Sequence, residues 1–96
     1  METDLKGKVI FASASTDGLG LAIATRAVEE GARVFLGGRT KARLEEAVGK
    51  LSKIAEDSQG GVVGAVLDMA SADSIQAWVR EGQKEFGEPW GLLVNA

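Results

Sequence analysis

Short apolar runs alternate along this chain with stretches in which apolar residues recur every three or four positions. The runs predict buried strands at residues 8–13, 33–36 and 62–67, and a fourth strand that begins at Leu92. These runs are continuously apolar, a pattern typical of strands that are covered on both faces. Such strands belong to a parallel sheet.

Three helical patterns separate the strands. The first spans residues 18–30 and is followed by Gly31, where a glycine would end a helix. The second follows Thr40 as a cap and loses its pattern near residues 57–61, and the third opens at Ser71 and stops at Gly87. Their predicted apolar positions are Leu19, Ala22, Ile23 and Ala27, then Leu44, Ala47, Val48, Leu51, Ile54 and Ala55, then Ile75, Trp78, Val79 and Phe86.

Strands and helices joined by such short connections predict right-handed crossovers and a parallel α/β sheet. We expect a Rossmann-like, doubly wound sheet with strand order 3-2-1-4, truncated after the fourth strand, so that residues 1–96 form one partial domain. A ligand crevice would then open between strands one and four, beside residues 13–20.

Composition narrows the classes of function. The 96 residues are 45% hydrophobic and carry a net charge of -3 without a basic cluster, which argues against nucleic acid or a membrane surface as partner. Cysteine and histidine are absent, which excludes disulfides, thiolate or imidazole catalysis and the usual zinc sites. Neither a secretory signal nor a membrane-spanning run is found, so we expect a cytoplasmic location.

A loop of small residues follows the first strand and enters the first helix. Glycines at the start of a helix let backbone N–H groups and the positive helix end face an anion, which predicts a site for a nucleotide's pyrophosphate. A tight turn that packs helix against strand remains an alternative. The candidate residues are Ser13, Ala14, Ser15, Thr16, Asp17, Gly18, Leu19 and Gly20.

The end of the second strand selects the cofactor. An acidic residue there would hold the ribose hydroxyls of NAD, but this chain has Gly38, Arg39 and Thr40. The guanidinium of Arg39 suits a 2′-phosphate, which predicts NADP in preference to NAD, although Arg39 as an ordinary solvated side chain stays an alternative. The charge of Asp17 opposes this phosphate unless Asp17 pairs with Arg39 or points to solvent.

Two further polar residues end strands at the same sheet edge. Asp68 is a candidate acceptor for an adenine amino group, or a partner of local backbone before the third helix. Asn95 is a candidate ribose contact or a turn residue. Trp78 has the spacing of a packing residue, and Trp90 follows Pro89 as a loop anchor.

Together these motifs resemble the N-terminal half of a classical short-chain dehydrogenase/reductase over nearly the whole chain. The family's loop Thr-Gly-x-x-x-Gly-x-Gly is matched with Ser13 and Ala14 in place of its first two residues, as in carbonyl-reductase-like members that carry Ala-Ser-Thr-Asp-Gly. The segments that carry the resemblance are residues 5–9, 13–20, 38–39, 67–69 and 93–96.

The resemblance implies an oxidoreductase that uses NADP(H) on an alcohol/carbonyl pair, with adenine by Asp68 and Met69 and with Asn95 positioning the cofactor. The family's catalytic serine, Tyr-x-x-x-Lys pair and further asparagine would all lie beyond Ala96, and the chain contains no tyrosine. No catalytic residue is therefore assigned, and whether these residues alone form an enzyme stays open.

Two other functions remain to be weighed. One is a stand-alone nucleotide-binding or dimerisation module, in which the apolar strand at residues 92–94 pairs with a second copy as a homo-oligomer. The other is a methyltransferase-like site for S-adenosylmethionine, which Gly38 and Arg39 disfavour because that ligand also needs an acid after the second strand.

Overall fold

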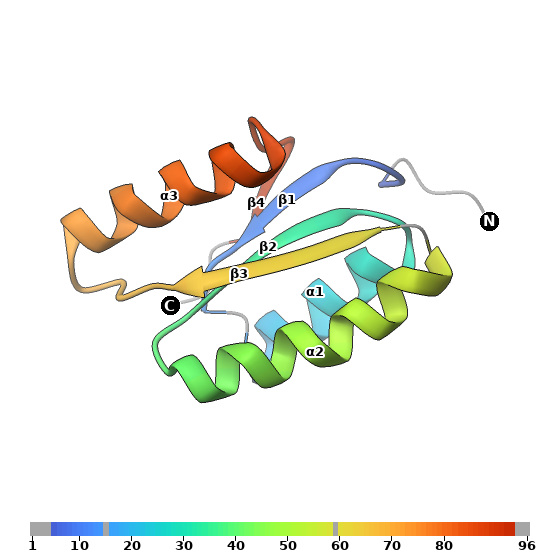
Figure 1. Ribbon diagram of the computed structural model, residues 1–96, viewed down its shortest axis with the longest axis horizontal. Coiled ribbons are helices and arrows are strands. Elements are labelled where there is room, and N and C mark those ends of the chain that lie inside the picture. Colours follow the sequence, from blue (N-terminus) through green and yellow to red (C-terminus); the bar gives the residue numbers. More distant parts are fainter. Residues whose placement is uncertain (1–4, 15, 59, 94–96) are drawn as a thin grey trace.

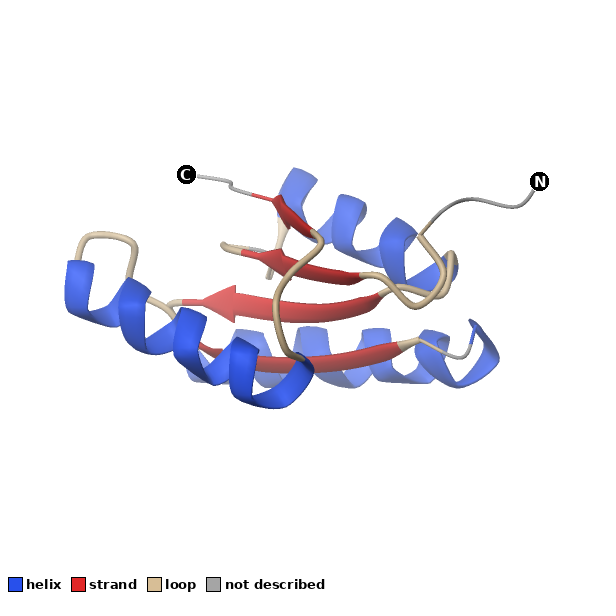
Figure 2. Cartoon of the chain, turned by 90° about the horizontal axis from the view of Figure 1, so that it is seen from above, coloured by secondary structure: helices blue, strands red, loops and turns tan. Residues whose placement is uncertain are grey.

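A parallel sheet forms the centre of the molecule. The computed structural model describes residues 5–14, 16–58 and 60–93. Its strands lie side by side in the order β3-β2-β1-β4, as Figure 2 shows along the sheet. This confirms the predicted α/β architecture and strand order. The strands are β1 (Val9–Ala12), β2 (Arg33–Gly38), β3 (Gly61–Val66) and β4 (Gly91–Leu93).

The helices cover both faces of the sheet. Helices α1 (Gly18–Glu29) and α2 (Lys41–Ser58) lie on one face, and α3 (Ala72–Phe86) lies on the other (Figure 1). Ser71 caps α3 by accepting from the N–H of Ser74, and Gly87 ends it with φ 82°, both as predicted. Helix α2 continues to Ser58, whose hydroxyl donates to the carbonyl of Val28 at 2.6 Å.

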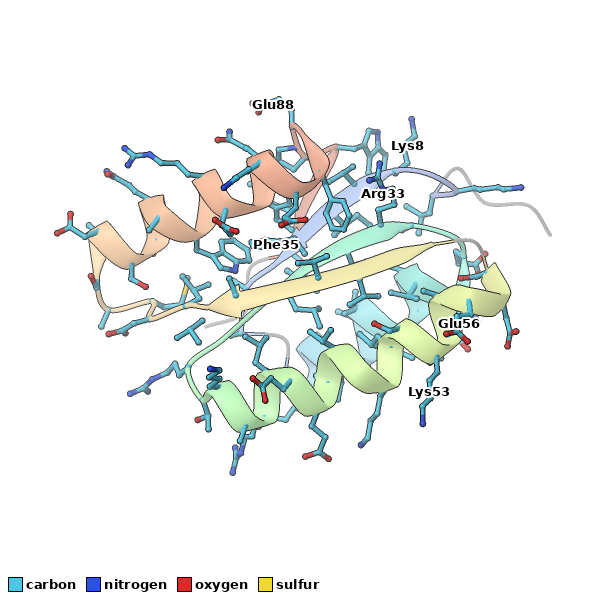
Figure 3. All side chains as sticks on the ribbon, viewed as in Figure 1. Lys8, Arg33, Phe35, Lys53, Glu56 and Glu88 are labelled. Atoms are coloured by element: carbon cyan, nitrogen blue, oxygen red, sulfur yellow. The ribbon has the colours of Figure 1, made fainter. Side chains whose placement is uncertain are left out.

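Two cores result, one on each face. The continuous apolar runs send alternate side chains to opposite faces, so Val34 and Leu36 meet α1 and α2 while Phe35 meets α3. Figure 3 shows Phe35 between the sheet and α3. Its ring lies 5.4 Å from that of Phe11 and 5.1 Å from that of Trp78, measured between centroids. Trp78 is buried and donates through Nε1 to the carbonyl of Leu36, which confirms it as a packing residue.

Strand β2 is longer than its apolar run predicts. Gly37 and Gly38 continue the pairing with β3, opposite Ala65 and Val66. A side chain at Gly37 would approach Leu67 to 2.8 Å and Trp78 to 3.0 Å, so glycine is needed where β2 passes beneath α3. The carboxyl end of β2 is therefore bare backbone immediately before Arg39.

The predicted buried face of α1 is wrong for Leu19, Ala22 and Ile23, which are exposed, and is confirmed for Ala27. Leu19 and Ile23 are 71% and 42% exposed, whereas the residues that pack on the sheet are Gly20, Ala24, Ala27 and Val28. The helix is apolar on two adjacent sides, and its small residues face the sheet because they allow a close approach. The side of α1 that carries the larger apolar residue Ile23 borders a groove of about 310 Å³ beside β4. The groove is lined by Leu5, Ile10, Ala22, Ile23, Ala24, Arg26, Ala27 and Leu93.

Candidate functional site

A cleft of about 540 Å³ opens at the carboxyl ends of the strands, where ligands bind in open α/β sheets. It is bounded by the loop before α1, by the connection from β2 to α2, and by the residues after β3. Its lining residues are Ala14, Thr16, Asp17, Gly38, Arg39, Thr40, Arg43, Leu67 and Met69. The predicted phosphate loop and the predicted ribose-selecting segment thus share one cleft.

The loop begins where Ser13 fastens β1 to β4. The Ser13 N–H and hydroxyl both donate to the carbonyl of Leu93, at 3.0 and 3.4 Å, and the side chain is buried. Ala14 then turns the chain with φ 47°, in the left-handed region. Ser13 therefore holds the base of the loop, while Ala14 and Thr16 reach the cleft.

Helix α1 offers an anion site at its first turn. Gly18 has φ 57° and a Cβ built there would meet nothing within 4 Å, so this part of the backbone is open to a ligand. The first turn carries no acidic side chain, and its leading N–H groups lack partners within the helix. Both features suit the pyrophosphate of a dinucleotide.

Gly38 lets the loop lie across the end of β2. A Cβ at Gly38 would overlap the side-chain methyl of Thr16, so no other residue fits while Thr16 keeps its position. Arg39 and Thr40 follow directly, exposed and lining the cleft, with Thr40 immediately before α2. A guanidinium and a helix start therefore lie together at the end of the cleft away from β4.

Asp17 pairs with an arginine that sequence analysis missed. Its Oδ2 lies 3.5 Å from Nη1 of Arg43, in the first turn of α2. Asp17 therefore pairs with Arg43 and not with Arg39, and its side chain is 75% exposed to solvent. Although Asp17 is the N-cap residue of α1, its side chain makes no cap hydrogen bond. Arg39 precedes α2, so helical spacing does not relate it to Arg43, and it is the shared cleft that brings the two guanidinium side chains together.

Past β3, the chain brings Leu67 and Met69 to the cleft. Oδ1 of Asp68 accepts from the N–H of Ala70 at 2.9 Å, and the Asp68 N–H donates to the hydroxyl of Ser74 at 2.9 Å. The bond to Ala70 is the partnership between the Asp68 side chain and local backbone that we weighed. The part of Asp68 in adenine binding stays a prediction.

The remaining predicted site residues are Leu19, Gly20, Ser15 and Asn95. Leu19 is exposed, Gly20 is buried on the side of α1 that faces the sheet, and neither lines the cleft. Ser15 and Asn95 lie outside the described residues. Trp90, which we predicted as a loop anchor, is 58% exposed, and the Lys8 ammonium lies 5.6 Å from its ring centre. The backbone N–H of Trp90 donates to the carbonyl of Val9.

Two absences apply to residues 5–14, 16–58 and 60–93. These ranges contain no group of three or more acidic, histidine or cysteine side chains that is arranged to hold a metal ion. Nor do they contain a helix with the length and apolar character needed to cross a membrane.

The comparisons with known proteins agree with this geometry. A family profile described as short chain dehydrogenase matches residues 8–96. The dehydrogenase/reductase SDR family member 4 of Caenorhabditis elegans is 36% identical over 90 residues, which cover 94% of this chain and 33% of that protein. The chain spans about a third of the length of the curated relatives that it matches.

Solved structures share the fold. L-sorbose reductase from Gluconobacter frateurii, complexed with NADPH and L-sorbose, superposes with a TM-score of 0.90 at 33% identity, covering 100% of this chain and 35% of that one. NADH-dependent reductase A1-R′, complexed with NAD, has a TM-score of 0.81 at 29% identity, covering 96% and 37%. These likenesses support a nicotinamide dinucleotide as cofactor, and the chain belongs to the short-chain dehydrogenase/reductase family.

Proposed function

We propose that this chain binds NADP(H) and forms the cofactor-binding part of an oxidoreductase that acts on an alcohol/carbonyl pair. The observation that carries the proposal is the cleft in which Arg39 and Thr40 face the loop of Ala14, Thr16 and Asp17. When bound, the cofactor supplies a nicotinamide that accepts or donates hydride.

The pyrophosphate would rest on the loop and the first turn of α1. Gly18 keeps the backbone open there, and the free N–H groups of a helix start favour negative charge. Gly38 adds to this because the absence of a side chain lets the loop close over the end of β2. The residues present therefore fit a dinucleotide.

The adenosine end would carry the extra phosphate of NADP. Residues 37–40 offer no carboxylate to accept from the ribose hydroxyls, whereas the Arg39 guanidinium can hold a phosphate with two parallel N–H bonds. Met69, 38% exposed beside the cleft, gives adenine an apolar surface, and Asp68 is the proposed partner of its amino group.

Binding measurements with the protein expressed from its complete reading frame test this proposal. We expect NADPH to bind more tightly than NADH. Arg39→Leu should lower the affinity for NADPH about tenfold and change the affinity for NADH less than twofold. Arg80→Leu serves as the control, because Arg80 is an exposed arginine on α3 that does not line the cleft. Equal weakening of both dinucleotides by Arg39→Leu would refute the 2′-phosphate role.

The proton-transfer chemistry is proposed to come from residues outside these 96. In the family a tyrosine exchanges a proton with the substrate oxygen beside a lysine, and this sequence has no tyrosine. We expect the coding sequence past Ala96 to continue into a Tyr-x-x-x-Lys motif. An intact mass equal to that of residues 1–96 alone would exclude catalysis by this mechanism.

A second candidate function is a nucleotide-binding module that dimerises without catalysis. The favouring observation is apolar exposure at the β4 edge. Leu92 is 67% exposed on the face that carries α3, and Ile23 and Leu93 line a groove on the opposite face. A discrete dimer that binds nucleotide and shows no turnover would support this candidate. A soluble monomer with turnover would reject it.

A further inference from the structure

The ion pair between Asp17 and Arg43 joins the two elements that form the cleft. Asp17 lies in the loop before α1, and Arg43 lies in α2, with 3.5 Å between Oδ2 and Nη1. Both side chains are largely exposed, at 75% and 69%. Both also line the cleft that contains Arg39. A pair that stands at the proposed phosphate site and remains open to solvent is available to an incoming anion.

We propose that Arg43 is a second guanidinium for the 2′-phosphate and that Asp17 is its counter-ion while no phosphate is bound. This inference rests on the proposed NADP(H) function and adds to it a residue that sets cofactor preference. Asp17 then lowers the preference for the phosphorylated cofactor, and Arg43 raises it.

The charge count explains why Arg39 alone is insufficient. Asp17 contributes one negative charge and Arg39 one positive charge, so these two residues cancel and Arg43 makes the sum +1. A phosphate monoester carries about -1.5 to -2 at pH 7, and it needs this excess. The hollow next to the pair adds no net charge, because its Glu46 and Lys50 pair with each other at 3.7 Å.

An exchange of partners is physically reasonable at this position. An exposed ion pair is weak because water competes for both charges, so Asp17 does not lock Arg43. A phosphate has more charge and more acceptor oxygens than a carboxylate, and a guanidinium has five N–H donors to offer. Arg43 can therefore turn toward the phosphate from the same helical position.

The test uses nucleotide fragments that report only on the adenosine end. Adenosine 2′,5′-bisphosphate and 5′-AMP differ only by the 2′-phosphate. The protein, expressed from its complete reading frame, would be titrated with each ligand, and NMR chemical shifts would report binding. The variants are Arg43→Leu and Asp17→Asn, since asparagine also caps a helix well. The control is Lys53→Leu, which removes one charge from the same helix at a side chain that points away from the sheet (Figure 3).

We expect Arg43→Leu to lower the affinity for the bisphosphate about tenfold and the affinity for 5′-AMP less than twofold. Retained binding of 5′-AMP would also show that the site is folded. Asp17→Asn should raise the affinity for the bisphosphate about threefold, because the Asp17 carboxylate no longer repels the 2′-phosphate or competes with it for Arg43. Lys53→Leu should change neither ligand by more than twofold.

Three results would overturn the inference. The first is an unchanged ratio of the two affinities in Arg43→Leu. The second is an equal fall of that ratio in Lys53→Leu, and the third is weaker binding of the bisphosphate by Asp17→Asn. If the parent protein prefers the bisphosphate and Arg43→Leu keeps that preference, this inference is refuted and the proposed NADP function is not. A parent protein with no preference for the bisphosphate refutes the proposed NADP function as well.

Discussion

Ala14 adopts a conformation that glycine would adopt at lower cost. Its φ of 47° brings Cβ close to the following carbonyl, at a cost of about 1 kcal/mol or more for an L-residue. The family's loop has glycine at this position, whereas this chain accepts the strain. The turn is kept because Ser13 on one side and Gly18 on the other fix the path of the loop.

Replacing Ala14 by glycine is therefore expected to stabilise the fold. The relief of strain exceeds the added entropy of the unfolded chain, so Ala14→Gly should raise the free energy of unfolding by about 0.5–1 kcal/mol. Ala77→Gly, at an exposed position inside α3, should lower it by a similar amount. Thermal melting of both variants measures the difference, and a fall in stability for Ala14→Gly would contradict the strain.

Helices and strands could be predicted from the sequence wherever a local pattern of residues determined them. The four strands followed from continuous apolar runs, and the Ser71 cap and the Gly87 stop followed from local capping chemistry. The strand order followed from the short connections of a doubly wound sheet. The face of α1 did not, because that helix is apolar on two sides and periodicity does not say which one meets the sheet. The Asp17 pair with Arg43 was also missed, since it depends on how α1 and α2 lie side by side.

Helix α3 packs closely on the sheet because of one glycine. A Cβ at Gly82 would lie 2.6 Å from Phe11 Cζ and 2.7 Å from Phe35 Cδ2, so either the rings or the helix must move. We expect Gly82→Ala to lower the free energy of unfolding by about 1–2 kcal/mol, after allowing for the better helix propensity of alanine.

Helix α2 supplies the matched control for that prediction. Gly49 is exposed within the helix, and a Cβ there meets nothing within 4 Å. Gly49→Ala should therefore raise the free energy of unfolding by about 0.5–1 kcal/mol. Denaturant unfolding of the two variants should show opposite signs. The same sign in both would mean that helix propensity outweighs packing at Gly82.

At the scale of the whole molecule, the two edges of the sheet differ. Strand β3 has α2 packed against one of its faces, whereas β4 lies beside the apolar groove that α1 borders. Leu92 is 67% exposed on the face that carries α3, and Ile23 is 42% exposed on the face that carries α1. An open strand edge next to apolar surface promotes pairing with other chains. Residues 1–96 expressed by themselves should therefore associate as their concentration rises.

A single charge on this edge should reduce that association. Leu92→Lys introduces a cation that must be desolvated when two β4 edges meet, so sedimentation velocity should show a larger monomer fraction at every concentration. Val66→Lys at the opposite edge changes the net charge by the same amount at a residue that is 50% exposed, and it should leave association nearly unchanged. If both substitutions act equally, net charge rather than the β4 edge governs association. If neither acts, the β4 edge at Leu92 is not the contacting surface.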